Sequence, residues 1–393
     1  MEIAEIKKRF EEMFGEGGNI RIFASPGRVN MIGEHTDYNG GYVFPAALTM
    51  RTAIAYRRRN DNIIRMAATD LDVVVEADIN NLENYKDLKW GNYQIGVADT
   101  MKKAGYDIYG CDMLFDDTTP HGGGLSSSAA IEVATALAFA TASNEEKGIT
   151  DPVDMIEMAK LSQKAEHEYI GVKCGIMDQF ASAMGKKNHA IFLDCRDLSY
   201  KLVPLDIEGC KIVISNTNKK HSLADSKYNE RRGECETAVE ILKGCMPGIT
   251  CLGDVKPADF EKYAGKIENE TVRRRAAHVV YEIERVVESV DALEKGNVKK
   301  FGKLMNESHD SLRDLYEVTG RELDTLVEEA RKIKGTVGSR MTGAGFGGST
   351  VSIVKEEFVN EFIEKVGKAY EEKIGYPASF YVSEIGDGGR EIK

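Results

Sequence analysis

A cation, two acids and a histidine lie within ten residues of one another near the start of the chain. Residues 26–41 read PGRVNMIGEHTDYNGG and place Arg28, Glu34, His35 and Asp37 among four glycines. Carboxylates accept hydrogen bonds, arginine donates them and histidine does either, which suits recognition of a small polyhydroxylated ligand. Turn-forming residues dominate and no regular period fits, so the sequence predicts a loop between two ordered segments. A solvated turn is the alternative for this stretch taken alone.

A second candidate site lies at residues 119–130, which read TPHGGGLSSSAA. Three glycines and three serines directly precede a helical pattern of apolar residues. The free N–H groups and positive dipole at a helix N-terminus attract an anion, and glycine lets a phosphate approach the backbone closely. Serine hydroxyls add donors and a Mg²⁺ ligand. A flexible loop with an N-capping serine is the alternative, but capping needs fewer of these residues.

A third glycine cluster, residues 341–348, matches G-x-G-x-x-G literally. A dinucleotide-binding fingerprint precedes a helix, whereas residues 349–354, STVSIV, predict a strand. Ser349 stands where a Walker A loop has lysine, and the chain contains neither H-R-D nor D-F-G. The cluster is therefore predicted to connect two strands.

Two further acids stand near helix ends in the middle of the chain. An acid followed by proline, Asp151-Pro152, predicts the start of a helix that runs towards Gly171 and carries Glu166 near its end. Residues 174–180 begin another helical pattern with Asp178 in its first turn. Stabilisation of the helix dipole is the ordinary explanation for an acid there.

The chain is expected to form two domains, since 393 residues exceed the size at which one core keeps growing. A strand-rich half gives way to a helix-rich half near Ser199, so we divide the chain into residues 1–198 and 199–393. Expected helices cover 2–14, 91–104, a long segment carrying Tyr228, most of 257–334, and 356–372. Expected strands cover 21–24, 42–48, 52–56, 63–67, 111–115, 190–193, 199–203, 211–215, 349–354 and 379–382.

Composition limits the classes of partner. The net charge of −12 argues against a nucleic-acid-binding protein, and the basic run Arg57-Arg58-Arg59 is interpreted as a solvated face. The N-terminus lacks the apolar region of a secretory signal, and the longest apolar-rich stretch, residues 129–142, is interrupted by Glu132 and too short to span a bilayer. Seven cysteines without a C-x-x-C pair suit reduced thiols. We therefore expect a cytoplasmic protein that binds neither membrane nor nucleic acid.

Five stretches resemble one family, the GHMP small-molecule kinases. Its three motifs are similar to GRVNMIGEHTDYNGG, PHGGGLSSSAA and MTGAGFGGS, and the first resembles the signature of galactokinases in particular. Two further stretches agree, AEHEYIGVKCGIMDQFAS at residues 165–182 and SNTNKKHSLADSKYNERRGECE at residues 215–236. They occur in family order, so the resemblance covers essentially the whole chain. Each glycine motif alone is weak, whereas five in order are highly specific.

The resemblance implies a two-lobed α+β fold with the active site in the cleft between the lobes. The N-terminal lobe would be like domain 2 of ribosomal protein S5, and the C-terminal lobe would be ferredoxin-like. The implied reaction transfers the γ-phosphoryl group of ATP, with Mg²⁺, to the anomeric C1 hydroxyl of α-D-galactose and feeds galactose catabolism by the Leloir pathway. Galactose and MgATP are then the partners, and the protein is expected to be a monomer. Phosphoryl transfer depends mainly on positioning and charge neutralisation, which these residue types supply.

The resemblance also assigns roles to particular residues. Asp178 matches the catalytic carboxylate that accepts the proton of the C1 hydroxyl. Arg28 matches the arginine that stabilises the developing phosphoryl charge and keeps that carboxylate ionised. Ser128 and Glu166 match the pair that holds Mg²⁺. Sugar-binding positions match Glu34, His35, Thr36, Asp37, Gly175 and Tyr228, and the phosphate-binding loop matches Gly122, Gly123, Gly124, Leu125, Ser126, Ser127 and Ser128.

Three residues depart from the family pattern. Met31 stands where leucine or isoleucine is usual, and Ala344 and Ser349 replace a glycine and a cysteine that are common in the third motif. The first is an exchange of one apolar residue for another. The other two leave nucleotide affinity open without changing the expected reaction.

Several alternative functions share part of this motif pattern. A GHMP kinase for N-acetylgalactosamine or arabinose is the strongest rival, although the unbroken HTDYNGG run favours galactose. Mevalonate and homoserine kinases lack GEHTDYN. A non-catalytic sensor of galactose and ATP on the same scaffold would lose part of the glycine–serine loop or the catalytic carboxylate, and both are intact here.

Overall fold

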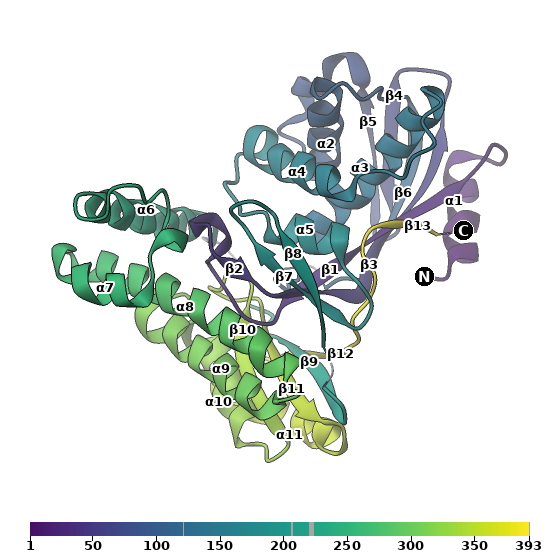
Figure 1. Cartoon of the computed structure of the whole chain (residues 1–393). Helices are drawn as coiled ribbons and strands as arrows, with labels where there is room; N and C mark the ends of the chain where they lie inside the picture. Colours follow the sequence, from purple (N-terminus) through teal and green to yellow (C-terminus); the bar gives the residue numbers. More distant parts are fainter. Residues whose placement is uncertain (121, 206, 220–223, 393) are drawn as a thin grey trace.

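The computed structural model describes residues 1–120, 122–205, 207–219 and 224–392. Two groups of elements meet along a central seam, one rich in strands and formed mostly by the N-terminal half, the other rich in helices (Figure 1). Within the described residues, none of the helices combines the length and apolar composition that crossing a membrane requires.

A six-stranded sheet forms the core of the first group. Its order is β13-β1-β3-β6-β4-β5, and neighbouring strands are antiparallel except for the parallel pair β4 and β6. The strands are β1 (Arg21–Asn30), β3 (Pro45–Arg58), β4 (Ile63–Ala68), β5 (Leu71–Asp78), β6 (Cys111–Asp117) and β13 (Arg390–Ile392).

Alternating side chains give this sheet two apolar faces. Phe23 and Ile54 pack under three helices on one face, whereas Ile22 and Ala53 pack against Phe10 of the N-terminal helix on the other. The sheet is therefore buried on both sides. The three helices are α2 (Asn92–Lys103), α3 (Ser127–Glu146) and α4 (Met155–Ala165), and the N-terminal helix is α1 (Ile3–Phe14).

A small three-stranded sheet and a short helix complete the junction between the groups. The sheet has the antiparallel order β2-β7-β8, and it contacts both β3 and a long helix of the second group, α8. The short helix, α5, packs on β1 and α3. Their bounds are β2 (Tyr42–Val43), β7 (His189–Asp194), β8 (Tyr200–Pro204), α5 (Met177–Met184) and α8 (Glu270–Glu294).

The second group is built on an antiparallel four-stranded sheet of order β10-β11-β9-β12. Ile212 and Ile214 face α8 and α9, whereas Val213 faces α10 and α11, so this sheet also buries both faces. The elements are β9 (Cys210–Asn216), α6 (Ala224–Lys243), α7 (Pro257–Tyr263), α9 (Val298–Ser311), α10 (Gly320–Lys332), β10 (Thr336–Thr342), β11 (Ser349–Lys355), α11 (Val359–Ile374) and β12 (Ser379–Ser383).

Most expected elements are present, and the exceptions have physical causes. The expected loop at residues 26–41 begins as strand, because β1 continues to Asn30. A register shift between Pro26 and Arg28 breaks the alternation that would have revealed it. Segments expected at 42–48 and 52–56 as two strands are the short β2 and one continuous strand, β3. Two strands were not expected: β5, an edge strand exposed over much of its length, and β13.

Two local interpretations were wrong. Asp154, not Asp151, caps α4, because its carboxylate accepts the N–H groups of Ile156 and Glu157. The basic run at residues 57–59 is not simply a solvated face. Arg57 and Arg59 donate to the buried carboxylate of Asp112, which needs partners when removed from water.

The division of the chain at residues 198 and 199 stays a prediction. Strand pairing crosses it in two places, because β8 pairs with β7 and β13 returns from the C-terminus to pair with β1.

All seven cysteines are free thiols.

Candidate active site

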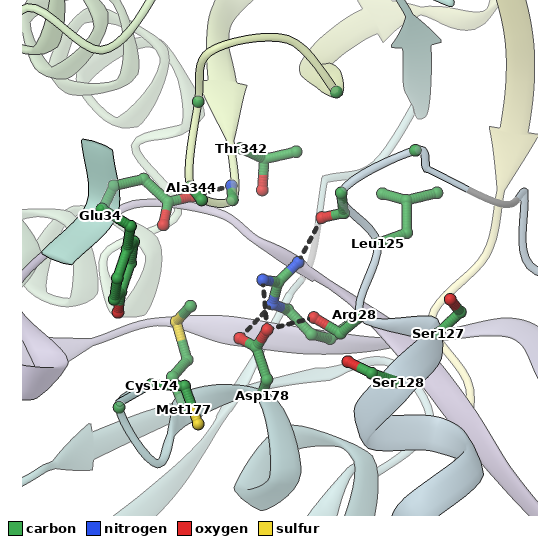
Figure 2. A pocket seen from close by; sticks show the side chains of 18 of the residues that line it. Arg28, Glu34, Leu125, Ser127, Ser128, Cys174, Met177, Asp178, Thr342 and Ala344 are labelled. Atoms are coloured by element: carbon green, nitrogen blue, oxygen red, sulfur yellow. Dashed lines mark hydrogen bonds and ion pairs between the residues drawn. The ribbon is translucent and has the colours of Figure 1, made fainter. Parts of the chain in front are cut away.

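A pocket of about 410 Å³ lies where the two groups of elements meet. Figure 2 shows its lining side chains converging from several elements. Nearly all of the predicted site residues line it, although they are spread from residue 28 to residue 228 of the sequence. Thr36 instead lies behind the lining, where its hydroxyl donates to the carbonyl groups of Gly33 and Tyr42 and supports the loop.

An ion pair between Arg28 and Asp178 stands at the centre of the pocket. Strand β1 supplies the arginine and the first turn of α5 supplies the aspartate. Arg28 Nε and Nη2 donate to Asp178 Oδ1 and Oδ2, each at 2.8 Å, and Nη1 donates to the carbonyl of Gly124 at 2.8 Å (Figure 2). This two-bond geometry fixes both side chains and ties them to the glycine–serine loop.

Ser126 binds the same carboxylate instead of capping its helix. Its hydroxyl donates to Asp178 Oδ2 at 2.5 Å, and its backbone takes the left-handed conformation, with φ +59°. Among the described residues, no side chain caps the N-terminus of α3. The N–H groups of the first helical turn are therefore left for an anion in the pocket.

Glycine is required in the loop that leads into α3. Gly122 and Gly124 both have φ +68°, a region that other residues rarely adopt. A Cβ on Gly27 of β1 would lie 2.6 Å from the Leu125 carbonyl oxygen, so strand and loop are in direct contact. The predicted anion-binding turn is thus held against the strand that carries Arg28.

Ser128 and Glu166 lie together beside this loop. Both line the pocket, and Glu166 begins a single π-helical turn, Glu166–Ile170, at the end of α4. Burial raises the pKa of Glu166, and the hydrogen bonds from Cys174 and Ser128 oppose that rise. The described residues contain no group of three or more acids, histidines or cysteines arranged for a metal ion. Two oxygen donors beside the glycine–serine loop nevertheless fit Mg²⁺, which keeps several waters and binds phosphate oxygens.

Glu132 is a buried acid behind the pocket lining, close to Glu166, that the sequence did not single out. It lies on α3, is fully buried and accepts a hydrogen bond from Gln179 Nε2 at 3.1 Å. Burial and the neighbouring charge of Glu166 raise its pKa well above the usual carboxyl range. In the sequence it looked only like an interruption of an apolar helix, and only the packing of α3 against α5 reveals its neighbours.

His35 is held in one tautomer. Burial lowers the pKa of His35 to about 3, so the ring is neutral. Nε2 lies 3.1 Å from the Ala344 carbonyl, which only accepts, so Nε2 carries the proton and Nδ1 accepts from the Tyr38 hydroxyl at 2.8 Å. His35 also has a left-handed backbone, with φ +61°, a strain that is common at functional sites.

Asp37 is a buried acid close to a second acid. Burial and the charge of Asp178 raise the pKa of Asp37 to about 7. A Cβ on Gly175 would lie 1.7 Å from Asp37 Oδ2, so only glycine fits there. Tyr228 of α6 closes this end of the pocket, with its ring centroid 5.7 Å from that of His35. Residues 220–223 of the stretch that contains Tyr228 lie outside the described residues.

The third glycine cluster connects β10 and β11, as predicted, and it touches both binding loops. Gly343 N–H donates to Glu34 Oε1 at 2.8 Å, and the Ser349 hydroxyl donates to the Gly123 carbonyl at 2.6 Å. The departures from the family pattern therefore have structural places. Ser349 braces the glycine–serine loop, and Ala344 contributes its backbone carbonyl to His35.

Family models match three parts of the chain. Residues 8–58 match the galactokinase galactose-binding signature, residues 92–186 match the GHMP kinases N terminal domain, and residues 289–372 match the GHMP kinases C terminal domain. The matched segments include the strand of Arg28, the helix of Asp178 and the hairpin of Gly343.

Curated relatives match the chain over nearly its whole length. The galactokinase of Bacillus subtilis is 48% identical over 99% of both chains, and that of Fusobacterium nucleatum is 50% identical over 98% of both. The galactokinase of Clostridium acetobutylicum is 52% identical over 94% of both chains.

Solved structures confirm the predicted GHMP kinase fold. Lactococcus lactis galactokinase complexed with galactose is 42% identical and superposes with a TM-score of 0.94 over 99% of this chain and 100% of that chain. The mevalonate kinase of Methanococcus jannaschii, at 20% identity, superposes with a TM-score of 0.65 over 95% of this chain and 100% of that chain and shares the fold alone.

The raised pKa of Asp37 predicts a pH-dependent stability penalty. An unfolded carboxyl titrates near about 4, so the folded state binds this proton more tightly. The free energy of unfolding therefore falls as pH rises from about 4 through about 7 and stays lower above that. In Asp37→Asn this loss is absent. The Tm of the variant minus that of the native chain should therefore increase between about pH 5 and about pH 8. A Tm difference that does not change with pH would contradict the assignment.

Ser349→Ala is expected to weaken ATP binding. The Gly123 carbonyl loses its hydroxyl partner, and a lost hydrogen bond of about 1 kcal/mol corresponds to a roughly fivefold rise in the KM for ATP. The matched control is Ser352→Ala on the same strand, whose buried hydroxyl donates to Ser339 Oγ. Equal effects of the two variants on the KM for ATP would show that Ser349 has no special relation to the loop.

Proposed function

This chain belongs to the galactokinase family of GHMP kinases, and we propose that its pocket transfers the γ-phosphoryl group of ATP to the C1 hydroxyl of α-D-galactose. The products are α-D-galactose 1-phosphate and ADP. Family membership rests on relatives about half identical over nearly the full length. The observation that carries the residue assignment is the Arg28–Asp178 pair, which stands between a phosphate-binding loop and a loop of sugar-binding acids.

Asp178 is the group that receives the C1 hydroxyl proton in this proposal. Both of its oxygens already accept hydrogen bonds from Arg28, and Oδ2 accepts another from Ser126. These donors hold the carboxylate in one orientation, which serves the positioning that phosphoryl transfer requires. Arg28 lies between the carboxylate and the Gly124 carbonyl, so its remaining positive charge can offset charge that develops on the transferred group.

The phosphates of ATP are assigned to the loop Gly122–Ser128. Its uncapped helix N-terminus and left-handed glycines support this role. Ser128 and Glu166 would hold Mg²⁺, which when bound supplies charge neutralisation for the β- and γ-phosphates.

The sugar is assigned to the side of the pocket formed by Glu34, His35, Asp37, Gly175 and Tyr228. Carboxylates in a largely buried site can pair with the hydroxyls of one epimer and are left unpaired by another, which penalises the wrong sugar. Because Gly175 has no side chain, the Asp37 carboxylate can lie directly against it in the pocket lining. Thr36 would act on the sugar only through the loop that it supports.

The same proposal covers the position of the site between the lobes, the compartment and the oligomeric state. We assign the active site to the cleft between an N-terminal lobe ending near residue 198 and a C-terminal lobe, within a cytoplasmic monomer that serves galactose catabolism.

The test of the proposal is release of ADP from MgATP with galactose, glucose, N-acetylgalactosamine, arabinose or mevalonate as acceptor. Turnover should be highest with galactose. Asp178→Asn should lower kcat by on the order of 10³-fold because the proton acceptor is lost while the fold is kept. Asp194→Asn is the matched control, since Asp194 pairs with Arg196 outside the pocket.

Two results would contradict the proposal. Highest turnover on another sugar would keep the kinase and refute the substrate. Saturable galactose binding in the presence of ATP without turnover would indicate a sensor and refute the enzyme.

A further inference from the structure

Arg340 is a fully buried arginine on β10 that the proposed reaction does not use. Its side chain is 0% exposed, and it is the largest of the fully buried side chains. A buried charge is strongly unfavourable unless it is paired and hydrogen-bonded. The groups that surround Arg340 should therefore show what it is for.

The contacts of Arg340 lead to the loop of sugar-binding acids. Nη1 donates to the Asn30 carbonyl at 2.9 Å and to Glu34 Oε1 at 3.4 Å, and Nε donates to Ser308 Oγ at 3.2 Å. Nη2 lies 4.0 Å from Glu282 Oε1. Arg340 thus connects β10 of the second sheet to Asn30, where the loop begins, and to Glu34 within the loop. Arg340 itself does not line the pocket.

Glu34 is the acid that Arg340 holds. It lines the pocket although it is only 1% exposed. The hydrogen bonds from Gly343 N–H and from Arg340 both go to Oε1. Oε2 is thereby the oxygen left to accept a hydroxyl of the ligand.

We propose that Arg340 is a positioning residue for sugar recognition, which keeps Glu34 ionised and oriented so that Oε2 accepts a hydroxyl of the sugar. Arg340 does not touch the substrate. The inference rests on the proposed sugar-binding role of Glu34 and deepens it, because it explains how a nearly inaccessible acid remains an acceptor.

Among the charges around Glu34, that of Arg340 does most to keep the carboxylate ionised. Burial raises the pKa of Glu34, and Arg340 and then Arg28 oppose that rise. Arg28 is already engaged by Asp178, and Asp37 on the same loop is a like charge.

In the described part of the chain, the other titratable groups packed against Glu34 are neutral or acidic. His35, on the same loop, is neutral because burial lowers its pKa to about 3. From α8, His278 lies with Nε2 3.2 Å from the Glu34 carbonyl, and burial lowers its pKa to about 4. Glu282 accepts the Gly33 N–H, and its pKa lies at about 2, because Arg285, His278 and Arg340 outweigh its burial.

Removing Arg340 should therefore raise the pKa of Glu34 further and favour its protonated form at the lower end of the pH range. A protonated carboxyl donates where the sugar hydroxyl expects an acceptor, so galactose would bind less well. Raising the pH would restore the ionised form. The ratio of the variant's galactose KM to that of the native chain should then fall as pH rises. Asp37 titrates in both proteins, so its effect on the galactose KM cancels in this ratio.

The experiment compares Arg340→Met and Arg340→Lys with Arg275→Met. Arg275 is a matched control, because it is also buried in the helical group but binds Glu234, Glu317 and the Leu315 carbonyl. Galactose KM, ATP KM, kcat and Tm are measured for each protein from about pH 6.5 to about pH 9.

Arg340→Met should raise the galactose KM by about tenfold or more at pH 7 and change the ATP KM by less than about threefold. That excess should shrink as pH rises. Arg340→Lys keeps the charge and loses part of the orientation, so its galactose KM should rise by about threefold or more, with the pH dependence of the native chain. Arg275→Met should lower Tm and leave the galactose KM unchanged.

A purely structural role for Arg340 would lower Tm without a selective effect on galactose, and that result would overturn the inference. A pH-independent KM ratio for Arg340→Met would also overturn it. If that variant does not fold, Arg340→Lys decides, because an unchanged galactose KM in it refutes the positioning role. A native chain that does not phosphorylate galactose contradicts the proposed function instead, and calorimetric galactose binding to the same variants then tests Arg340 separately.

Discussion

The two-bond pair between Arg28 and Asp178 is the interaction on which the rest of the site depends. It joins a strand of the first sheet to a helix 150 residues later in the chain, and the same guanidinium binds the Gly124 carbonyl of the glycine–serine loop. Strand, helix and loop must therefore be correctly packed before the pair can form. Because the pocket side of Asp178 is still accessible, with its side chain 31% exposed, the pair is fixed by protein on one side and open to substrate on the other.

The second constraint is the set of contacts between the C-terminal half and the loop that carries Glu34 and His35. Helix α8 binds Gly33 and Glu34 through Glu282 and His278, and the hairpin between β10 and β11 binds Glu34 and His35. The same hairpin reaches the glycine–serine loop through Ser349. One glycine-rich connection thus contacts both the Glu34 loop and the glycine–serine loop.

The sequence alone predicted the chemistry better than the connections that hold it. Arg28, Glu34, Asp37, the glycine–serine loop and Asp178 were recognisable from residue types and motifs, and they line one pocket. The strand character of residues 26–30 was hidden by a bulge, and β5 by its exposure. Glu132 and Arg340 could not be singled out, because what marks them is proximity to groups distant in the chain, Glu166 and Glu34, which no local spacing records.

The central claim, that Arg28 and Asp178 act as one unit, is tested most directly by a double-mutant cycle on kcat/KM for galactose. The cycle uses Arg28→Gln, Asp178→Asn and the two together, each checked for native Tm. Residues that act as a unit are strongly non-additive, so the double variant should lose about as much as Asp178→Asn alone, within roughly tenfold. A double variant whose loss equals the product of the two single losses would show that the two side chains act independently, and it would contradict this account.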